Sequence, residues 1–393
     1  MIRVGFIMGF GDKSWMGGVN YFKNLLLVIS RDQGRRIDPV ILCAQKHVDE
    51  CRKDFPGLET IGSDIFDSSS LGWRLSKVKQ RVFGKDARID RFLKTNNIRL
   101  LSHSGHLGKK SEIPTLAWIP DFQHTRMPDF FGEAEIHNRN MRFKRICNYC
   151  SGVLVSSEDA RNDLRNFCEK SISKSHVLRF VSCLASNEKA DGGAILKEVY
   201  GIEGKFFYLP NQFWVHKNHH VVLRAINLLK SEGKNIRVIF TGNPKDSRQA
   251  ESYNNLMMYV SDNDLESHTR FLGLIPYQHL VVLQSTCVAI INPSFFEGWS
   301  TTVEEAKTLG KAVILSDIPV HREQNPERCA YFDPHDERSL ADIMWAQWNS
   351  YSGEVEQAAM AKAEEKLPAR MQGFSDDYQN IVFEVLKQYS ARS

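Results

Sequence analysis

Short apolar runs recur along the first half of the chain, and each ends in turn residues. The runs are IRVGFIM, DPVILCA, IRLLSHS, TLAWIP and GVLVSS, and helical patterns such as NYFKNLLLVIS and EDARNDLRNFCEK stand between them. Short apolar runs bounded by turns are typical of buried strands, whereas apolar spacings of three and four residues indicate amphipathic helices. The alternation of the two predicts a parallel sheet covered by helices on both faces.

The same alternation begins again after residue 205, with FFYLPN, IRVIFTG, TRFLG, VAIINPS, KAVILSD and CAYFDP as the apolar runs. The polar, glycine-bearing residues 182–205 separate the halves and are the expected hinge. We therefore predict two doubly wound α/β domains, residues 1–185 and 186–373, with a ligand cleft between them. A last helix, about residues 374–393, spaces Tyr378, Ile381, Val382 and Val385 along one face and is expected to pack back on the first domain.

Composition supports two globular domains, because 393 residues are too many for one typical domain. A net charge of +4 is too small to indicate a nucleic-acid binder. No apolar run approaches the roughly 18 residues that cross a bilayer, and the first residues lack the features of a signal peptide, so we expect a cytoplasmic protein. Cys147 and Cys150 form a C-x-x-C without a second pair, which favours coincidence on a helix over a metal site.

A glycine-rich segment, MGFGDKSWMGGVN, follows the first apolar run. Gly9 and Gly11 match the first two glycines of G-x-G-x-x-G, but Ser14 stands at the third position. Gly17 and Gly18 instead open the next helix. The pair can bring backbone and a helix N-terminus close to an anionic ligand, or it can simply allow a sharp turn.

Residues 292–323 carry the strongest chemical pattern. After the run VAII come Glu297 in a loop, hydroxyl residues beginning at Ser300, and a helix that contains Glu305. Backbone N–H groups at a capped helix start suit phosphate oxygens, and two carboxylates suit sugar hydroxyls. The alternative is that the acidic residues only stabilise the helix start.

The segment EGWSTTVEEA resembles the donor-site motif of the retaining glycosyltransferases of family 4, the glycosyl transferases group 1. That resemblance implies the GT-B fold, in which two Rossmann-like domains face each other across a cleft. It also implies that Glu297 contacts hydroxyls of the donor sugar, that Glu305 contacts the ribose, and that the intervening backbone contacts the diphosphate. The donor-binding residues implied here are Glu297, Gly298, Trp299, Ser300, Thr301, Thr302 and Glu305. Ser300 and the threonines replace a Gly and a Leu-Pro that are frequent in the family.

A second similarity covers FFYLPNQFWVHKNHHVVLRAINLL, where the family has an Arg and a Lys facing the diphosphate. Lys217 takes the position of the Lys, whereas Gln212 stands at that of the Arg. Lys217 is then expected to carry more of the charge neutralisation. In FLGLIPYQHL the resemblance implies that Leu274 and Ile275 contact the nucleobase.

In the first domain the resemblance implies that Gly17 and Gly18 lie near the donor diphosphate and the acceptor. WIPDFQHTRMPDFF resembles a segment in which many relatives have a His-Asp pair facing the acceptor. Asp121 takes the Asp position, and His124 follows about one helical turn later. Together with Glu297 they are the candidate catalytic residues, with His103 and His106 as competitors for activating the acceptor hydroxyl.

The resemblance implies a retaining, metal-independent hexosyltransferase without a cofactor. Its donor would be a UDP-, GDP- or dTDP-sugar, and its acceptor a hydroxyl of a glycan or lipid-linked glycan in surface polysaccharide biosynthesis, of O-antigen or capsule type. The basic residues 73–94 fit either an anionic membrane surface, on the inner face of the cytoplasmic membrane, or a solvated helix. The alternatives are a catalytically silent nucleotide-sugar-binding subunit of a glycan-assembly complex and another two-domain sugar enzyme such as an epimerase.

Overall fold

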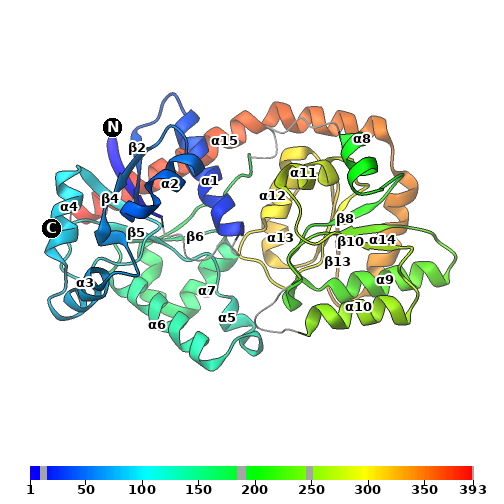
Figure 1. Ribbon diagram of the computed structural model, residues 1–393, viewed down its shortest axis with the longest axis horizontal. Helices are drawn as coiled ribbons and strands as arrows, with labels where there is room; N and C mark the ends of the chain where they lie inside the picture. Colours follow the sequence, from blue (N-terminus) through cyan, green and yellow to red (C-terminus); the bar gives the residue numbers. More distant parts are fainter. Residues whose placement is uncertain (9–15, 184–191, 245–250, 392–393) are drawn as a thin grey trace. The chain divides into compact units, whose positions relative to one another are not determined.

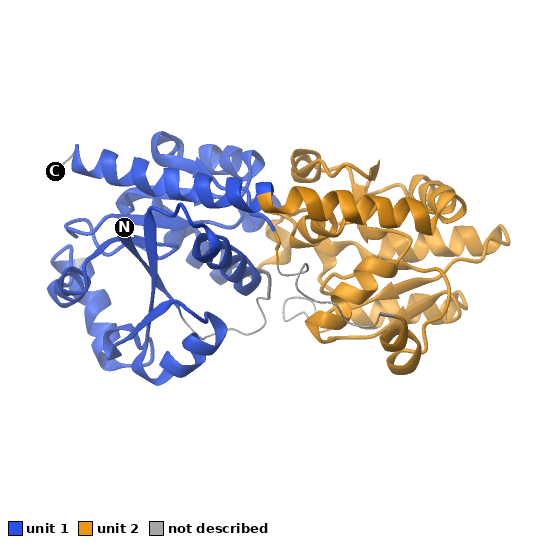
Figure 2. Cartoon of the chain, turned by 90° about the horizontal axis from the view of Figure 1, so that it is seen from above, with its two compact units in different colours: residues 1–126, 133–181, 369–393 blue, residues 127–132, 182–368 orange. Residues whose placement is uncertain are grey.

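The computed structural model describes residues 1–8, 16–183, 192–244 and 251–391. The loop with Gly9, Gly11 and Ser14 lies outside the described residues, as does the part of the expected hinge at residues 184–191. The chain divides into two compact units (Figures 1 and 2). Unit 1 comprises residues 1–126, 133–181 and 369–393, and unit 2 comprises residues 127–132 and 182–368. Each unit is described by itself.

Unit 1 is built on a parallel sheet with the strand order β3-β2-β1-β4-β5-β6-β7. The strands are β1 (Ile2–Ile7), β2 (Ile37–Cys43), β3 (Glu59–Gly62), β4 (Ile98–Ser102), β5 (Thr115–Trp118), β6 (Gly152–Val155) and β7 (Ser175–Val177). The α-helices are α1 (Met16–Arg31), α2 (Val48–Asp54), α3 (Leu71–Val82), α4 (Ala87–Thr95), α5 (Gln123–Arg126), α6 (Glu133–Tyr149) and α7 (Glu158–Cys168). The doubly wound prediction is confirmed, although β3 and β7 were not expected because they are short edge strands without a clear apolar run.

Unit 2 repeats this architecture with the strand order β10-β9-β8-β11-β12-β13, again with parallel pairs. The strands are β8 (Phe207–Leu209), β9 (Val238–Phe240), β10 (Thr269–Phe271), β11 (Ile290–Asn292), β12 (Val313–Ser316) and β13 (Cys329–Phe332). The helices are α8 (Gly192–Ala194), the 3-10 turn η7 (Val215–Lys217), α9 (His219–Ser231), α10 (Ser252–Asp262), α11 (Tyr277–Thr286), α12 (Thr301–Leu309), α13 (Pro319–Gln324) and α14 (Glu337–Ser350). All six strands of this sheet coincide with the predicted apolar runs.

Both sheets reverse their order beside the first strand of the unit. In unit 1 the reversal lies between β1 and β4, and in unit 2 between β8 and β11, where Ile290 pairs with Tyr208. Ligands of open α/β sheets bind outside the carboxyl ends of the strands at this topological switch point. The loops after β8 and β11 are therefore where a site of unit 2 is expected.

Side-chain caps begin the helices that border the sheets. Ser157 accepts a hydrogen bond from the backbone N–H of Ala160 at the start of α7, and Asp336 accepts one from Ser339 at the start of α14. Helix α12 ends at Gly310, whose φ of 67° lies in the left-handed region. A Cβ at Gly310 would come within 2.4 Å of the carbonyl oxygen of Ala359, so this turn requires glycine.

The C-terminal helix α15 (Gly353–Ser390) is longer than the predicted residues 374–393. Its residues up to Pro368 cluster with unit 2 and the later ones with unit 1. In the later part, Asp32 accepts hydrogen bonds of 2.9 Å from both Ser375 and Gln379. The four residues expected to form its apolar face are all buried: Tyr378, Ile381, Val382 and Val385.

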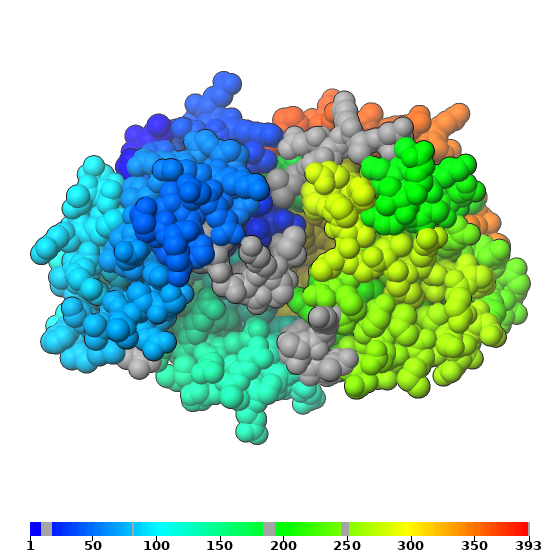
Figure 3. Space-filling view, viewed as in Figure 1, coloured from blue at the N-terminus to red at the C-terminus, as the bar shows by residue number. Residues whose placement is uncertain are grey.

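Helix α3 lies at the surface of unit 1 (Figure 3), and several of its apolar side chains are exposed. Its buried positions instead include the polar residues Ser76 and Gln80. This is the reverse of an ordinary surface helix, in which the apolar face packs on the core. The exposed side chains, 55% to 75% accessible, are Leu71, Leu75, Val78, Val82 and the adjoining Phe83. Among the described residues, no helix combines the length and the hydropathy needed to span a bilayer.

Candidate functional site

Two asparagines mark the switch point of unit 2. Asn292 ends β11 and Asn211 follows β8, and the side-chain amide of Asn211 donates a 3.0 Å hydrogen bond to Oδ1 of Asn292. Both side chains are buried. The backbone of Gly242 approaches Asn211 so closely that a Cβ would lie 2.3 Å from its carbonyl oxygen, and its φ of 145° also favours glycine. These contacts fix a layer of polar side chains at the carboxyl ends of the strands.

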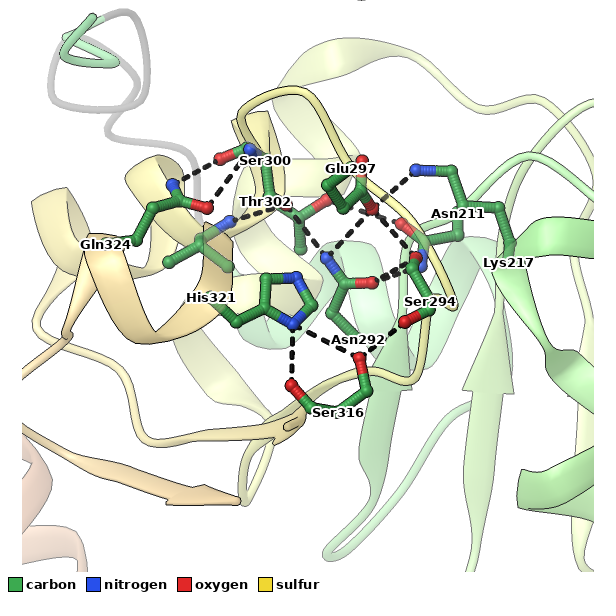
Figure 4. Close-up of polar contacts among 11 residues, drawn as sticks. Asn211, Lys217, Asn292, Ser294, Glu297, Ser300, Thr302, Ser316, His321 and Gln324 are labelled. Atoms are coloured by element: carbon green, nitrogen blue, oxygen red, sulfur yellow. Dashed lines mark hydrogen bonds and ion pairs between the residues drawn. The ribbon is translucent and has the colours of Figure 1, made fainter. Parts of the chain in front are cut away.

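A buried ion pair lies next to these asparagines (Figure 4). Lys217 Nζ lies 2.6 Å from Glu297 Oε1, and the two side chains are only 13% and 10% exposed. The same oxygen accepts a 2.7 Å hydrogen bond from the hydroxyl of Ser294. Burial by itself would raise the pKa of Glu297, but the charge of Lys217 outweighs it and lowers the pKa to about 2. The carboxylate is therefore ionised throughout the physiological range.

Asn218 joins the two loops that carry this ion pair. Its backbone adopts a left-handed φ of 54° between η7 and α9. Its side-chain amide donates to the carbonyl oxygens of Pro293 (3.2 Å) and Pro334 (2.8 Å). A backbone hydrogen bond of 2.8 Å from Phe295 N–H to the carbonyl of His216 adds a second link. The position of Lys217 is thus tied to the loop of Glu297.

Helix α12 starts beside the ion pair. Ser300 caps the helix by accepting from Val303 N–H, and its hydroxyl also accepts a 2.8 Å hydrogen bond from Asn292. The N–H groups of Thr301 and Thr302 find no acceptor among the described residues. Because the helix dipole adds positive potential there, this end of α12 suits the oxygens of a phosphate group.

Glu305 lies one turn into α12 in different surroundings. It is buried, and its two carboxylate oxygens accept from Tyr277 OH (3.2 Å) and from the side-chain amide of Gln284 (2.7 Å). Burial raises the pKa of Glu305 to about 7, although both hydrogen bonds act in the opposite direction. The two carboxylates of the segment EGWSTTVEEA, Glu297 and Glu305, therefore differ in charge near neutral pH.

The other predicted donor-site residues of unit 2 lie around this centre. Gln212 Oε1 accepts a 2.8 Å hydrogen bond from Asn243 N–H, so it supports the loop after β9. Gly298 is half-buried and Trp299 is buried between the ion pair and the helix start. In the segment before α11, Leu274 is 66% exposed and Ile275 packs partly on the core.

The predicted residues of unit 1 occupy several environments. Gly17 and Gly18 lie in the first turn of α1. Asp121 is half-buried and accepts a 3.0 Å hydrogen bond from Gln123 N–H at the start of α5. His124 is buried against Phe122 and other aromatic rings, and its Nε2 lies 3.1 Å from Asn140 Oδ1. Of the two candidate bases, only Asp121 keeps an accessible side chain.

The competing histidine His103 lies at the switch point of unit 1, directly after β4. Its Nε2 is 2.7 Å from the hydroxyl of Tyr21 and its Nδ1 is 2.8 Å from that of Ser102, so both ring nitrogens are hydrogen-bonded. The ring also packs against Phe6 and Trp118. Burial lowers the pKa of His103 to about 3, which keeps the imidazole neutral.

Asp262 is the last residue of α10, and Asp264 follows in the turn after the helix. Asp264 has a left-handed φ of 47°, and its carbonyl accepts from Lys230 Nζ at 2.9 Å. Cys147 and Cys150 are buried in an apolar cluster of unit 1. Across the described part of the chain, no three His, Cys, Asp or Glu side chains are grouped so that they could hold a metal ion.

Several residues of the site were not predicted. Asn211 and Asn292 stand directly after apolar runs, so the rule for carboxyl ends of strands could have found them. No local pattern marks Gln324, which accepts from Ser300 N–H at 3.1 Å and donates to the Ser300 carbonyl at 3.0 Å. No local pattern marks His321 on α13 either, because its place beside the site depends on how α13 packs in the folded chain.

Comparison with known proteins agrees with this geometry. Residues 197–346 match the family model described as glycosyl transferases group 1, and this range contains the whole centre described above. The chain is 24% identical over 350 residues to the O-antigen chain mannosyltransferase RfbU of Salmonella typhimurium, an alignment that covers 88% of each chain.

Solved structures share the fold over the full length. A glycosyltransferase from Rickettsia africae has a TM-score of 0.69 at 13% identity, covering 100% of this chain and 99% of the other. Anabaena Alr3699/HepE in complex with UDP-glucose has a TM-score of 0.63 at 13% identity, with 100% and 99% covered. Residues 197–346 therefore resemble the glycosyl transferases group 1, most of the chain resembles an O-antigen mannosyltransferase, and the fold is that of the two-domain GT-B proteins.

Proposed function

We propose that the protein transfers a sugar, with retention of configuration and without a metal ion, from a nucleoside diphosphate to a hydroxyl of a glycan or lipid-linked glycan in surface polysaccharide biosynthesis. The observation that carries the proposal is the Lys217–Glu297 pair beside the unpaired N–H groups that begin α12. Cations and helix-start N–H groups suit a diphosphate, and an ionised carboxylate suits sugar hydroxyls. The similarity to an O-antigen mannosyltransferase supports the acceptor class.

In this proposal the leaving group is stabilised by the chain alone. Lys217 and the N–H groups of Thr301 and Thr302 neutralise the diphosphate as negative charge accumulates on it. Glu297 accepts hydrogen bonds from hydroxyls of the transferred sugar, and Glu305 accepts them from the ribose. Preorganised donors of this kind lower the barrier because they need no reorientation during the reaction.

The configuration at the anomeric carbon is retained because the acceptor hydroxyl attacks on the same face from which the leaving group departs. The bond between the anomeric carbon and the phosphate oxygen breaks, and its electron pair stays with the nucleoside diphosphate. The acceptor oxygen forms the new bond on the same face, and its proton passes to the departing phosphate oxygen. Asp121 of unit 1, half-buried after β5, orients the acceptor hydroxyl.

A panel of UDP-, GDP- and dTDP-sugars tests the function. Calorimetric binding and donor hydrolysis are measured on the intact chain, on Glu297→Gln and on the control Glu266→Gln, an exposed carboxylate of the same unit. We expect one donor to bind and turn over, with loss only in Glu297→Gln. Binding without turnover for any acceptor would indicate the silent subunit, which the neutral Gln212 at the position of an expected Arg favours. Absence of binding would refute the donor site.

We also propose that helix α3 attaches the protein to the inner face of an anionic membrane, where a lipid-linked acceptor is present. The apolar side chains that α3 exposes can enter the acyl boundary, and exposed cations such as Arg74 and Lys79 can contact lipid phosphates. Lys77 lies over the ring of Trp73 at 5.2 Å, which orients both on the same side of the helix.

Vesicle sedimentation distinguishes this proposal from a solvated helix. Vesicles of phosphatidylcholine with phosphatidylglycerol are compared with phosphatidylcholine alone, for the intact chain and for Leu75→Gln with Val78→Gln. We expect the double substitution to weaken binding several-fold, whereas Met258→Gln, an exposed apolar residue of unit 2, leaves it unchanged. Equal binding by all three proteins would exclude α3 as the attachment surface.

A further inference from the structure

His321 on α13 is a fully buried histidine, and one of its ring nitrogens has no hydrogen-bond partner within the described part of the chain. Its Nδ1 lies 2.9 Å from the carbonyl oxygen of Ser316. A carbonyl oxygen only accepts hydrogen bonds, so Nδ1 carries the proton. In the neutral ring Nε2 is then an acceptor.

No partner for Nε2 is present among the described residues. Burial lowers the pKa of His321, although the charge of Glu297 counteracts it, so the ring is neutral at physiological pH. Buried polar atoms in native proteins almost always have a hydrogen-bond partner. An unused acceptor in this position therefore indicates that a donor is supplied from outside the chain.

Two links hold His321 beside the candidate donor site. Gln324, on the same helix, exchanges hydrogen bonds with both backbone groups of Ser300 at the start of α12. Ser316 donates a 2.6 Å hydrogen bond to the carbonyl of Ser294, in the loop that carries Glu297. The imidazole of His321 is therefore positioned through Gln324 on one side and through Ser316 on the other.

The two ring nitrogens of His321 point in opposite directions. Figure 4 shows Nδ1 turned toward Ser316 and the opposite nitrogen turned toward Asn292 and Glu297. Nε2 therefore faces the place where Glu297 would bind the transferred sugar.

We propose that His321 Nε2 accepts a hydrogen bond from a hydroxyl of the transferred sugar and so helps to select the donor. The inference rests on the proposed function and names a further residue for the sugar subsite. A phosphate is the wrong partner, because an ionised diphosphate has no proton to offer a neutral Nε2. A sugar hydroxyl, in contrast, can donate its proton to Nε2 and still accept hydrogen bonds from other groups.

The test compares nucleotide with nucleotide sugar. Calorimetry measures binding of the nucleoside diphosphate alone and of the matching nucleotide sugar to the intact chain, to His321→Phe and to the control His268→Phe. His268 also hydrogen-bonds a backbone carbonyl through Nδ1, but at the amino end of β10. We expect His321→Phe to bind the nucleotide sugar roughly tenfold more weakly and the nucleoside diphosphate unchanged, with no effect of His268→Phe.

Monodeoxyfluoro donors give a readout that a structural role would not move. Fluorine accepts but does not donate a hydrogen bond, so replacing the hydroxyl that His321 recognises should weaken binding to the intact chain roughly tenfold. The same replacement should have no further effect in His321→Phe, whereas replacements elsewhere on the sugar should weaken both proteins equally. His321→Gln serves as the variant if His321→Phe does not fold.

Distinct results overturn the two proposals. Equal loss of nucleoside diphosphate and nucleotide sugar in the variants, or additive losses at every fluorinated position, would refute the role of His321. If no fluorinated donor binds the intact chain more weakly than its parent, the proposal fails without any variant. If the intact chain binds no nucleotide sugar at all, the proposed function itself fails.

Discussion

The two units share the order of their first strands but differ in what those strands carry at the switch point. In unit 1 the residue after β4 is His103, whose ring nitrogens are both hydrogen-bonded and whose ring packs among aromatic side chains. In unit 2 the corresponding ends carry asparagines, an ion pair and a helix start whose first N–H groups have no acceptor among the residues that the structure describes. The first arrangement is satisfied internally, whereas the second is suited to a ligand.

Electrostatics separates the two regions in the same way. Burial keeps His103 neutral, because it lowers the pKa of the ring to about 3. Burial opposes the charge of Glu297 as well, but Lys217 reverses the effect and lowers the pKa to about 2. The same sheet topology can thus hold a structural centre or a charged site, and the side chains at the strand ends decide which.

The largest expected effect comes from removing the cation of unit 2. Lys217→Met should lower kcat/KM by about 10²- to 10³-fold, because one preorganised positive group at the leaving diphosphate is lost. Steady-state kinetics with the donor identified in the panel measure the change. Lys197→Met, an exposed lysine of the same unit, is the control and should leave kcat/KM unaltered. A loss below threefold in Lys217→Met would contradict the charge role.

The next effect concerns Glu305 and pH. Its folded pKa of about 7 lies above the ordinary 4.5, so its contribution to stability is present below pH 4.5 and is lost as the pH rises through 7. The free energy of unfolding should therefore fall between pH 4.5 and 8 by on the order of 3 kcal/mol more in the native protein than in Glu305→Gln.

Denaturant unfolding at each pH provides the measurement for Glu305. His103 of unit 1 should show the opposite pH dependence. Burial lowers its pKa, so its contribution to stability is present above pH 6.5 and is lost on acidification. Parallel pH dependences of the native protein and Glu305→Gln would show that Glu305 is ionised in the folded state.

A smaller effect is expected from the link between the two loops of the site. Asn218→Gly keeps the left-handed backbone but removes the hydrogen bonds to Pro293 and Pro334. We expect kcat to fall roughly tenfold, because Lys217 is held less firmly. Asn325→Gly, another left-handed asparagine of unit 2, is the matched control. An unchanged kcat would show that the loop is positioned by its backbone alone.

The smallest effect belongs to the switch point of unit 1. Tyr21→Phe removes the hydroxyl that pairs with His103 Nε2 and should cost about 1 kcal/mol of unfolding free energy. Donor nucleotide binding should not change, because the centre is structural. Denaturant unfolding and calorimetry measure the two quantities. A selective loss of activity without loss of stability would assign His103 to the reaction and break the comparison.

Prediction from sequence succeeded where the signal is local. The apolar runs located the six strands of unit 2, because a strand buried on both faces is continuously apolar. It failed for β3 and β7, whose edge positions leave half-exposed polar residues. It also left helix α6 unmarked, since only Phe143, Ile146 and Cys147 of that helix are buried.

For the candidate site, too, local features could be predicted from the sequence and features that depend on folding could not. The spacing of Glu297 and Glu305 and the position of Lys217 were readable in the sequence, because they belong to single loop-and-helix segments. Their opposite pKa shifts were not, since these depend on which buried neighbours each carboxylate meets in the folded chain.

Local patterns in the sequence were enough to predict the alternation of strands and helices, the motif that begins α12 and the likeness to group 1 glycosyltransferases. The folded structure was needed to show that Gln324 binds both backbone groups of Ser300 at that helix start, that both ring nitrogens of His103 are hydrogen-bonded, and that α3 exposes its apolar side. The physical reason is that hydrophobic periodicity acts over neighbouring residues, whereas burial and hydrogen-bond satisfaction depend on partners far along the chain.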